Sequence, residues 1–392
     1  MNGLRTDAEV PVPFNEERKQ HEELDQGGLR SGECGHAGRY WCLWRVTRFC
    51  RGGGGVSAKD PSEVTIGISM PEQQLERWRQ DGDNLKRQLE SKGYKVLLQF
   101  ADNKTDLQAS QIQNMANQGA DYVVIAAIDG TAVGPAAEAA KSNGAKVIAY
   151  DRLIMNTEAC DYYSTFNITE VGRLQGQYIV KKLGLDSGRK GPFNIELMTG
   201  SPTDNNAKYY FKGSWSVLEP YFKSGALVSP SGRVPRNLDD WQSIGIQNWD
   251  RQNAQSEMEN RINSYYNKGA HLDAVLAPND AIAMGTVNAV DAAGWDYYPI
   301  ITGQDAEKAN VANIVAGKQT MTVYKDTRKL ADSTAKLIDT LVKGGKPETN
   351  DTFNNGDKDV PSILLKPVSV DKDNVKKELV DSGYISAGDA GL

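Results

Sequence analysis

The sequence is poor in the side chains that supply most nucleophilic, acid–base and metal chemistry. Of its 392 residues, only three are histidine and four are cysteine. Most of them stand in the first fifty residues, at His21, Cys34, His36, Cys42 and Cys50. The rest of the chain keeps His271, which precedes an expected strand and should be solvated, and Cys160, which should be a small packed or loop thiol. A histidine general base is therefore not expected.

Motifs of known catalytic, nucleotide or metal sites are also missing from the sequence. The segment CGHAGRYWC (34–42) could suggest a metal site, but a paired CxxC and a second ligand pair are lacking. There is no GxSxG elbow, HExxH or Walker loop, and GGGG at 52–55 does not follow a strand. Two carboxylates could serve glycoside hydrolysis, yet nothing selects one acid and one nucleophile. We predict that the protein is not an enzyme and uses no metal and no cofactor.

Long apolar runs and an excess of positive charge are absent as well. No run approaches the length of a membrane span. A net charge of −6 disfavours broad electrostatic binding to nucleic acid. With 39% hydrophobic and 24% charged residues, the composition is typical of a globular protein, and the length suffices for two domains.

Residues 1–60 differ from the rest because they lack a sustained helix or strand period. They stand where a secretory signal would, but Arg45, Arg48 and Arg51 interrupt it, and its longest apolar run, YWCLW, is shorter than the usual core of about 7–15 residues. Val56-Ser57-Ala58 nevertheless resembles a small-x-small cleavage site. Two interpretations stay open: a signal peptide obscured by a wrong start or frame error, or a disordered extension. We exclude this leader from the fold, and the first interpretation predicts an extracytoplasmic protein.

From residue 61 onward, short apolar runs alternate with stretches of helical spacing. The predicted strands are 64–69, 95–100, 122–128, 146–150, 162–166, 193–200, 273–278, 299–303, 320–324 and 362–368. Such continuous runs, rich in Val, Ile and Tyr, are typical of parallel strands covered on both faces. Several intervening helices end on a glycine that can adopt a left-handed C-cap, at Gly93, Gly119, Gly144, Gly269 and Gly294. The pattern predicts an α/β protein with doubly wound sheets in two lobes.

Most of these strands lead into acids, amides or bases. The polar and aromatic residues at strand ends are Gln73, Arg77, Trp78, Asp129, Asp151, Arg152, Asn167, Asp204, Asn206, Asn279, Asp305 and Lys325. Ligands bind outside the carboxyl ends of parallel strands, so these residues should converge. Mixed acids, bases and amides do not fit a phosphate site, but they fit a neutral ligand whose hydroxyls both donate and accept. The sequence therefore favours a sugar.

Two alternatives concern individual residues. Trp78 and Trp249 could stack on the apolar face of a pyranose, although core packing explains either tryptophan equally well. Each strand-end Asp or Asn could be a helix N-cap. Capping alone does not explain Asp151 beside Arg152, or Lys325 at a helix start, where its charge opposes the helix dipole.

Nearly the whole regular part of the chain, from 61 to about 388, resembles the periplasmic sugar-binding proteins of ABC transporters, close to their xylose-binding and multiple-monosaccharide-binding branches. The motifs are LERW (75–78), AAIDG (126–130), VIAYDRLI (147–154), GSPTDNNA (200–207), APNDA (277–281), TGQDAE (302–307) and VYKDT (323–327). The resemblance implies that the sugar is hydrogen-bonded by Arg77, Asp129, Asp151, Arg152, Asn206, Asn279, Asp305 and Lys325. It implies that Trp78 and Trp249 contact the sugar faces. Two positions depart, Gln73 where a lysine is usual and Asn167 where an aspartate is usual.

The resemblance implies a type 1 periplasmic binding protein, with two Rossmann-like lobes joined by a multi-strand hinge. The first lobe is predicted over 61–166 plus 326–350, and the second over 167–325 plus 351–390. A monomer would close around a pentose or hexose, such as xylose, glucose, galactose or arabinose, and deliver it to an ABC-type permease. The alternative is the effector domain of a sugar-responsive transcription regulator, which would need an N-terminal helix-turn-helix that 1–60 do not indicate.

Overall fold

The computed structural model describes residues 59–267 and 269–392. The predicted leader up to residue 58, with CGHAGRYWC, Cys34, Cys42 and Cys50, lies outside these described residues. Within the described ranges, no helix combines the length and the apolar character needed to cross a membrane. Cys160 is buried at the start of a strand, and the His271 side chain is 61% exposed, as the sequence predicts.

The first lobe is built on a seven-stranded sheet in the order β11-β12-β5-β4-β3-β1-β2. Its strands are β1 (Thr65–Met70), β2 (Lys95–Phe100), β3 (Tyr122–Ile125), β4 (Lys146–Tyr150), β5 (Cys160–Phe166), β11 (Asp351–Asn354) and β12 (Asp359–Leu365). All pairs are parallel except β11 with β12. Its helices are η1 (Pro61–Glu63), α1 (Glu76–Glu90), α2 (Thr105–Asn117), α3 (Gly134–Ser142) and α9 (Thr327–Val342).

Side-chain spacing explains why these segments form the layers of the first lobe. Every residue of β3 is buried, as expected for a strand covered on both faces. Leu85 and Leu89 are fully buried on α1, while Ile112 and Met115 are fully buried on α2. Gly67 in β1 allows this close packing, because a Cβ there would lie only 2.6 Å from the sulfur of Met115 and that side chain would have to shift.

The second lobe contains a parallel four-stranded sheet, β7-β6-β8-β9, and an antiparallel pair, β10 with β13. A parallel bridge between Gln304 and Val323 connects the two. The strands are β6 (Phe193–Leu197), β7 (Leu227–Val228), β8 (Ala274–Leu276), β9 (Ile300–Ile301), β10 (Met321–Tyr324) and β13 (Val368–Asp371). The helices are α4 (Ile168–Leu183), α5 (Asn205–Lys223), η2 (Leu238–Ile244), η3 (Gln247–Trp249), α6 (Arg251–Arg261), η4 (Ile262–Tyr266), α7 (Asp280–Ala293), α8 (Lys308–Ala316) and η5 (Lys376–Val380).

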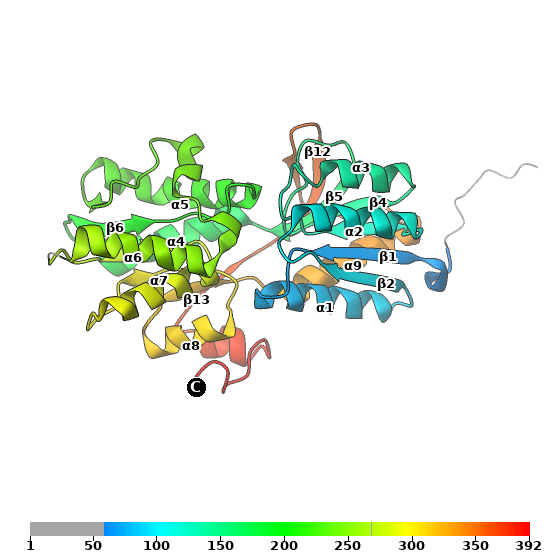
Figure 1. Cartoon of the computed structure of the whole chain (residues 1–392). Helices are drawn as coiled ribbons and strands as arrows, with labels where there is room; N and C mark the ends of the chain where they lie inside the picture. The colour runs from blue at the N-terminus through cyan, green and yellow to red at the C-terminus, as the bar shows by residue number, and fades with distance from the viewer. Residues whose placement is uncertain (1–58, 268) are drawn as a thin grey trace, which may run out of the picture. The chain divides into compact units, whose positions relative to one another are not determined.

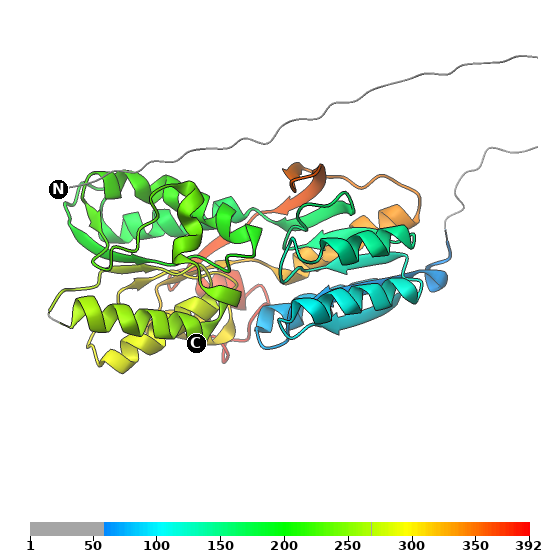
Figure 2. The ribbon, with the colours of Figure 1, turned by 45° about the horizontal axis from the view of Figure 1, so that its top comes forward.

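The chain passes between the two lobes three times (Figure 1; Figure 2). It leaves the first sheet after β5, returns between β10 and α9, and leaves again between β12 and β13. The first two crossings lie beside Asn167 and Lys325, where the sequence analysis expects them. The third crossing lies at Lys366-Pro367, between β12 and β13.

The structure differs from the predicted lobe boundary at residue 351. Residues 351–365 were expected in the second lobe, but β12 pairs in parallel with β5, and β11 pairs with β12. The sequence analysis treats 362–368 as one strand, whereas Pro367 separates β12 from β13. Proline cannot donate a ladder hydrogen bond and is rare inside sheets, so the apolar run is divided between the two lobes.

Candidate functional site

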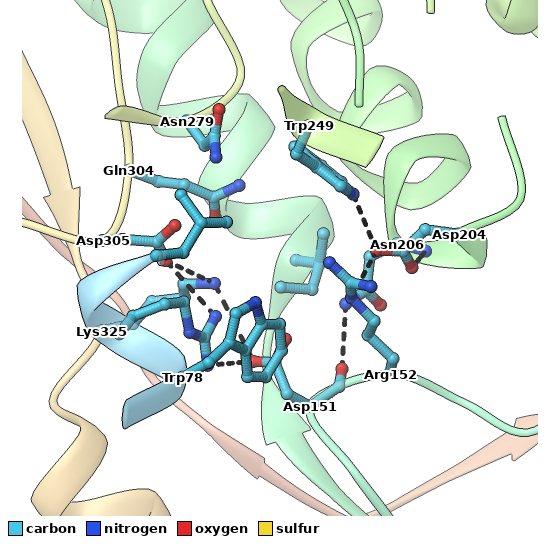
Figure 3. Close-up of a pocket in the computed structure, with 13 residues that line it drawn as sticks. Trp78, Asp151, Arg152, Asp204, Asn206, Trp249, Asn279, Gln304, Asp305 and Lys325 are labelled. Carbon is cyan, nitrogen blue, oxygen red and sulfur yellow. Dashed lines mark hydrogen bonds and ion pairs between the residues drawn. The ribbon is translucent and has the colours of Figure 1, made fainter. Parts of the chain in front are cut away.

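The carboxyl ends of strands from both lobes surround one small pocket. The pocket is lined by Leu75, Arg77, Trp78, Asp151, Arg152, Ile168, Asp204, Asn206, Trp249, Asn279, Gln304, Asp305 and Lys325. Figure 3 shows the labelled side chains turned toward this space from both lobes.

The structure brings ten of the thirteen predicted site residues to this pocket and leaves three outside it. Gln73 is exposed in the loop before α1. Asp129 accepts hydrogen bonds from the backbone of Thr131 and Ala132, each at 2.9 Å. Asn167 is the N-cap of α4 and accepts from Glu170 N at 3.0 Å. For these last two residues, the local turn and the helix cap occupy the side chain, which is the alternative that the sequence leaves open.

Arg77 connects the acids of the two lobes. It stands in the first turn of α1 and is 5% exposed. Its Nη2 donates to Asp151 Oδ2 at 3.0 Å, and its Nη1 donates to Asp305 Oδ1 at 3.4 Å. Asp151 follows β4 in the first lobe, whereas Asp305 follows β9 in the second. One guanidinium therefore links both walls of the pocket.

Lys325 provides a second cation between the same two acids. Its Nζ lies 2.9 Å from Asp305 Oδ1 and 3.9 Å from Asp151 Oδ2. Burial opposes ionisation of Asp151, but Arg77, Lys325 and Arg152 outweigh burial and lower its pKa. Asp151 is therefore a carboxylate at neutral pH and can accept hydrogen bonds from a hydroxyl.

On the opposite side of the pocket, Asp204 contacts three other residues. Its Oδ1 accepts from Asn206 N at 2.9 Å, which caps α5, and its Oδ2 lies 2.9 Å from Arg152 Nε. Trp249 Nε1 donates to the same Oδ2 at 3.1 Å. Burial raises the pKa of Asp204, while Arg152 acts against burial. Asp204 thus fixes one cation and one indole at once.

Glycine makes room for the Trp249 ring. A Cβ at Gly200 would overlap that ring, so only glycine fits directly after Thr199 in the motif GSPTDNN.

Trp78 is 2% exposed and Trp249 is 5% exposed, yet both line the pocket. Arg77 and Arg152 lie over the Trp78 ring, 4.2 and 4.9 Å from its centroid. Each tryptophan therefore packs in the core and also borders the pocket.

Asn206 reaches from the second lobe to the first. Its Nδ2 donates to the Asp151 carbonyl at 2.9 Å, and Tyr163 donates to Asn206 Oδ1 at 3.2 Å. Tyr163 also donates to the Asp151 carbonyl at 2.8 Å. The Asp151 backbone is in the left-handed region, with φ 60°, as are Trp249 at 56° and Asp305 at 98°. Such backbone costs energy for a residue other than glycine and is found preferentially at functional sites.

Sequence reasoning missed three lining residues, namely Leu75, Ile168 and Gln304. Leu75 and Ile168 are apolar and carry no polar signal. Gln304 follows the same strand as Asp305 and could have been included on that ground. It is 4% exposed, and its Oε1 has no hydrogen-bond partner in the described part of the chain. Asn279 caps α7 through its Oδ1 and leaves its amide nitrogen toward the pocket (Figure 3).

The arrangement suits a neutral ligand with several hydroxyls. Three carboxylates and three cations line the pocket, so the formal charges of these six side chains balance. Charged donors and acceptors each form strong hydrogen bonds to hydroxyls, and two indoles supply apolar surface. Among residues 59–267 and 269–392, no group of three or more His, Cys, Asp or Glu side chains is placed to hold a metal.

This fold and pocket define a solute-binding protein with two lobes. The family model of the periplasmic binding protein domain matches residues 66–346, and the chain belongs to this family. It has the type 1 periplasmic binding protein fold, as the sequence predicts.

Two relatives of this chain are sugar-binding proteins of the periplasm, and one related solved structure holds a sugar. A multiple sugar-binding periplasmic protein of Azospirillum brasilense is 46% identical over 326 residues, which cover 82% of this chain and 89% of that protein. The D-xylose-binding periplasmic protein of Escherichia coli is 40% identical over 327 residues, which cover 83% and 92% of the two chains. A solved ABC transporter solute-binding protein of Clostridium phytofermentans, with bound β-D-glucose, is 45% identical with a TM-score of 0.80, covering 83% of this chain and 99% of that chain.

Proposed function

We propose that this protein captures a monosaccharide between its two lobes and delivers it to an ABC-type permease. The observation that carries the proposal is the pocket itself, where acids, cations, amides and two tryptophans from both lobes surround one small space. Relatives at 40–46% identity are described as sugar-binding and xylose-binding periplasmic proteins, which supports the same ligand class.

Each kind of side chain has a separate task in this proposal. Asp151 and Asp305 accept from sugar hydroxyls, while Arg77 and Lys325 donate to them. Asn279 and Asn206 donate through their amides, and Trp78 and Trp249 border the faces of the ring. None of these side chains requires a charged ligand, so we propose a pentose or a hexose such as xylose, glucose, galactose or arabinose.

The mechanism is binding without covalent chemistry. A sugar that touches both lobes stabilises the closed arrangement relative to an open one, because only the closed arrangement completes its hydrogen bonds. The closed form would be the one that the permease recognises. We place the protein outside the cytoplasm, in line with the periplasmic relatives. We also propose that it acts as a monomer. These relatives do not favour the alternative of a transcription regulator.

A binding panel tests the proposal. Thermal shift is measured with xylose, glucose, galactose, arabinose, ribose and fucose, because a ligand of the native state raises the melting temperature. Titration calorimetry of a positive sugar is then repeated with Asp151→Ala and with Asp83→Asn, which changes an exposed residue of α1. We expect Asp151→Ala to abolish binding and Asp83→Asn to leave affinity unchanged. No shift with any sugar, or equal affinity in both variants, would contradict the proposal.

A further inference from the structure

A fourth carboxylate lies behind the pocket and does not line it. Asp81 is fully buried on α1, one turn after Arg77. Its Oδ2 accepts from Arg77 Nε at 3.0 Å and from Arg77 Nη2 at 2.7 Å. Its Oδ1 accepts from the Tyr150 hydroxyl at 2.6 Å. Both oxygens of Asp81 are therefore used, and Tyr150 fixes the carboxylate from β4.

This contact sets the orientation of the Arg77 guanidinium. Asp81 holds its Nε edge, so that only the outer edge of the guanidinium reaches Asp151 and Asp305. The central carbon of the same group lies over the Trp78 ring, 4.2 Å from its centroid. Because a guanidinium is planar, holding one edge restricts where its remaining N–H groups point. A buried carboxylate with no exposed surface is costly, and this position gives it a specific partner.

We propose that Asp81, supported by Tyr150, is a positioning residue of the sugar site and acts through Arg77. This inference rests on the proposed function, since Arg77 is there assigned to the sugar. Asp81 itself does not touch the ligand. Its role is to keep the Arg77 donors aimed at the pocket before a sugar arrives, which lowers the ordering cost of binding.

The protonation of Asp81 links this role to pH. Burial raises its pKa to about 6, and Asp151 acts in the same direction, while Arg77 and the Tyr150 hydroxyl act against it. From the C-terminal segment, Tyr384 also faces this group, and burial raises the pKa of Tyr384. Below about pH 6 the neutral carboxyl holds Arg77 less strongly. Sugar affinity should therefore fall as the pH is lowered through this range.

The test compares three variants by calorimetric titration with a sugar that the native protein binds. We expect Asp81→Asn to weaken affinity by about tenfold, Tyr150→Phe to weaken it less, and the exposed control Asp83→Asn to leave it unchanged. In an Arg77→Met background, Asp81→Asn should cause less than about a twofold further loss, because its effect passes through Arg77.

A pH series separates positioning from a merely structural role. Native affinity should decrease from pH 7.5 to pH 5.0, and the Asp81→Asn profile should be flatter. If Asp81→Asn fails to fold, the pH dependence of sugar affinity is measured on Tyr150→Phe instead. Full additivity with Arg77→Met, or the same pH profile in native protein and Asp81→Asn, overturns the inference while the proposed function stands. If the native protein binds no monosaccharide, both are overturned.

Discussion

Arg152 and Asp204 form an ion pair across the pocket, with Arg152 Nε 2.9 Å from Asp204 Oδ2. The two residues come from different lobes and are both buried, at 8% and 4% exposure. The pair therefore joins the two lobes and belongs to neither lobe alone. Removing one partner of a buried pair is costly, because the other charge stays without compensation.

Asp204→Asn should weaken sugar affinity by about tenfold or more, because it removes the partner of Arg152 and an acceptor of Trp249. Calorimetry measures the affinity, and small-angle scattering with sugar measures how far the lobes close. The matched control is Asp240→Asn, which breaks an exposed pair with Arg236 in the same lobe. Equal affinities for Asp204→Asn and the control would show that the pair is not needed for closure.

Trp78→Leu should weaken all bound pyranoses by a similar factor, about tenfold. Stacking on an indole depends little on hydroxyl stereochemistry, and the ring also supports two arginines at 4.2 and 4.9 Å. The sugars that bind the native protein are titrated one by one, with Trp295→Leu as a control outside the pocket. Loss of one sugar alone would contradict a stacking role.

Gln304→Leu should change stability and sugar affinity in opposite directions. Its Oε1 is buried without a partner among the described residues, so removing it should raise the unfolding free energy of the sugar-free protein by about 1 kcal/mol. Sugar affinity should fall, because the amide is lost from the pocket wall. Gln319→Leu is the matched control: Gln319 is equally buried but donates to Asp280 Oδ1 at 2.9 Å, so its loss should destabilise. Denaturant melts with and without sugar distinguish these outcomes.

Stability should increase on mild acidification because of Glu307. Burial and the nearby Asp305 raise its pKa to about 7, against the effect of Arg251. Since this exceeds the ordinary value of about 4.3, the native state binds more protons than the unfolded chain between these two pKa values. The unfolding free energy of the sugar-free protein should therefore rise from pH 8 to pH 6. Melting curves should show a smaller rise for Glu307→Gln and an unchanged rise for the exposed Glu348→Gln.

The sequence predicts which side chains reach the pocket when a side chain follows a strand and is not bound by the neighbouring backbone turn or helix cap. Asp151 follows β4 in the first lobe, while Asp305 and Lys325 follow β9 and β10 in the second, and the ends of these strands from both lobes meet at the pocket. All five glycines that the sequence predicts to be left-handed have positive φ, among them Gly144 at 93° and Gly294 at 69°. Fold class and most of the pocket therefore depend on periodicity and strand polarity, which a sequence displays.

The remaining features depend on contacts that periodicity does not record. Asp129 is an acid that follows a strand, as a ligand contact would be. Its carboxylate instead accepts hydrogen bonds from the backbone of the next turn. In the sequence, Asp81 has the appearance of an acid on the surface of a helix. Its hydrogen bond from Tyr150 of β4 is visible only in the structure. The lobe of β12 is likewise fixed by its pairing with β5, since its own residues would suit either sheet.

The interleaved course of the chain has a consequence for biosynthesis. The edge of β5 that β12 covers stays unpaired while the ribosome makes everything from α4 to α9. An uncovered strand edge on a growing chain is a template for wrong association. The first sheet can therefore be completed only after β12 has been made, so the edge of β5 stays open to wrong pairing for longer than it would in a sheet built from consecutive strands.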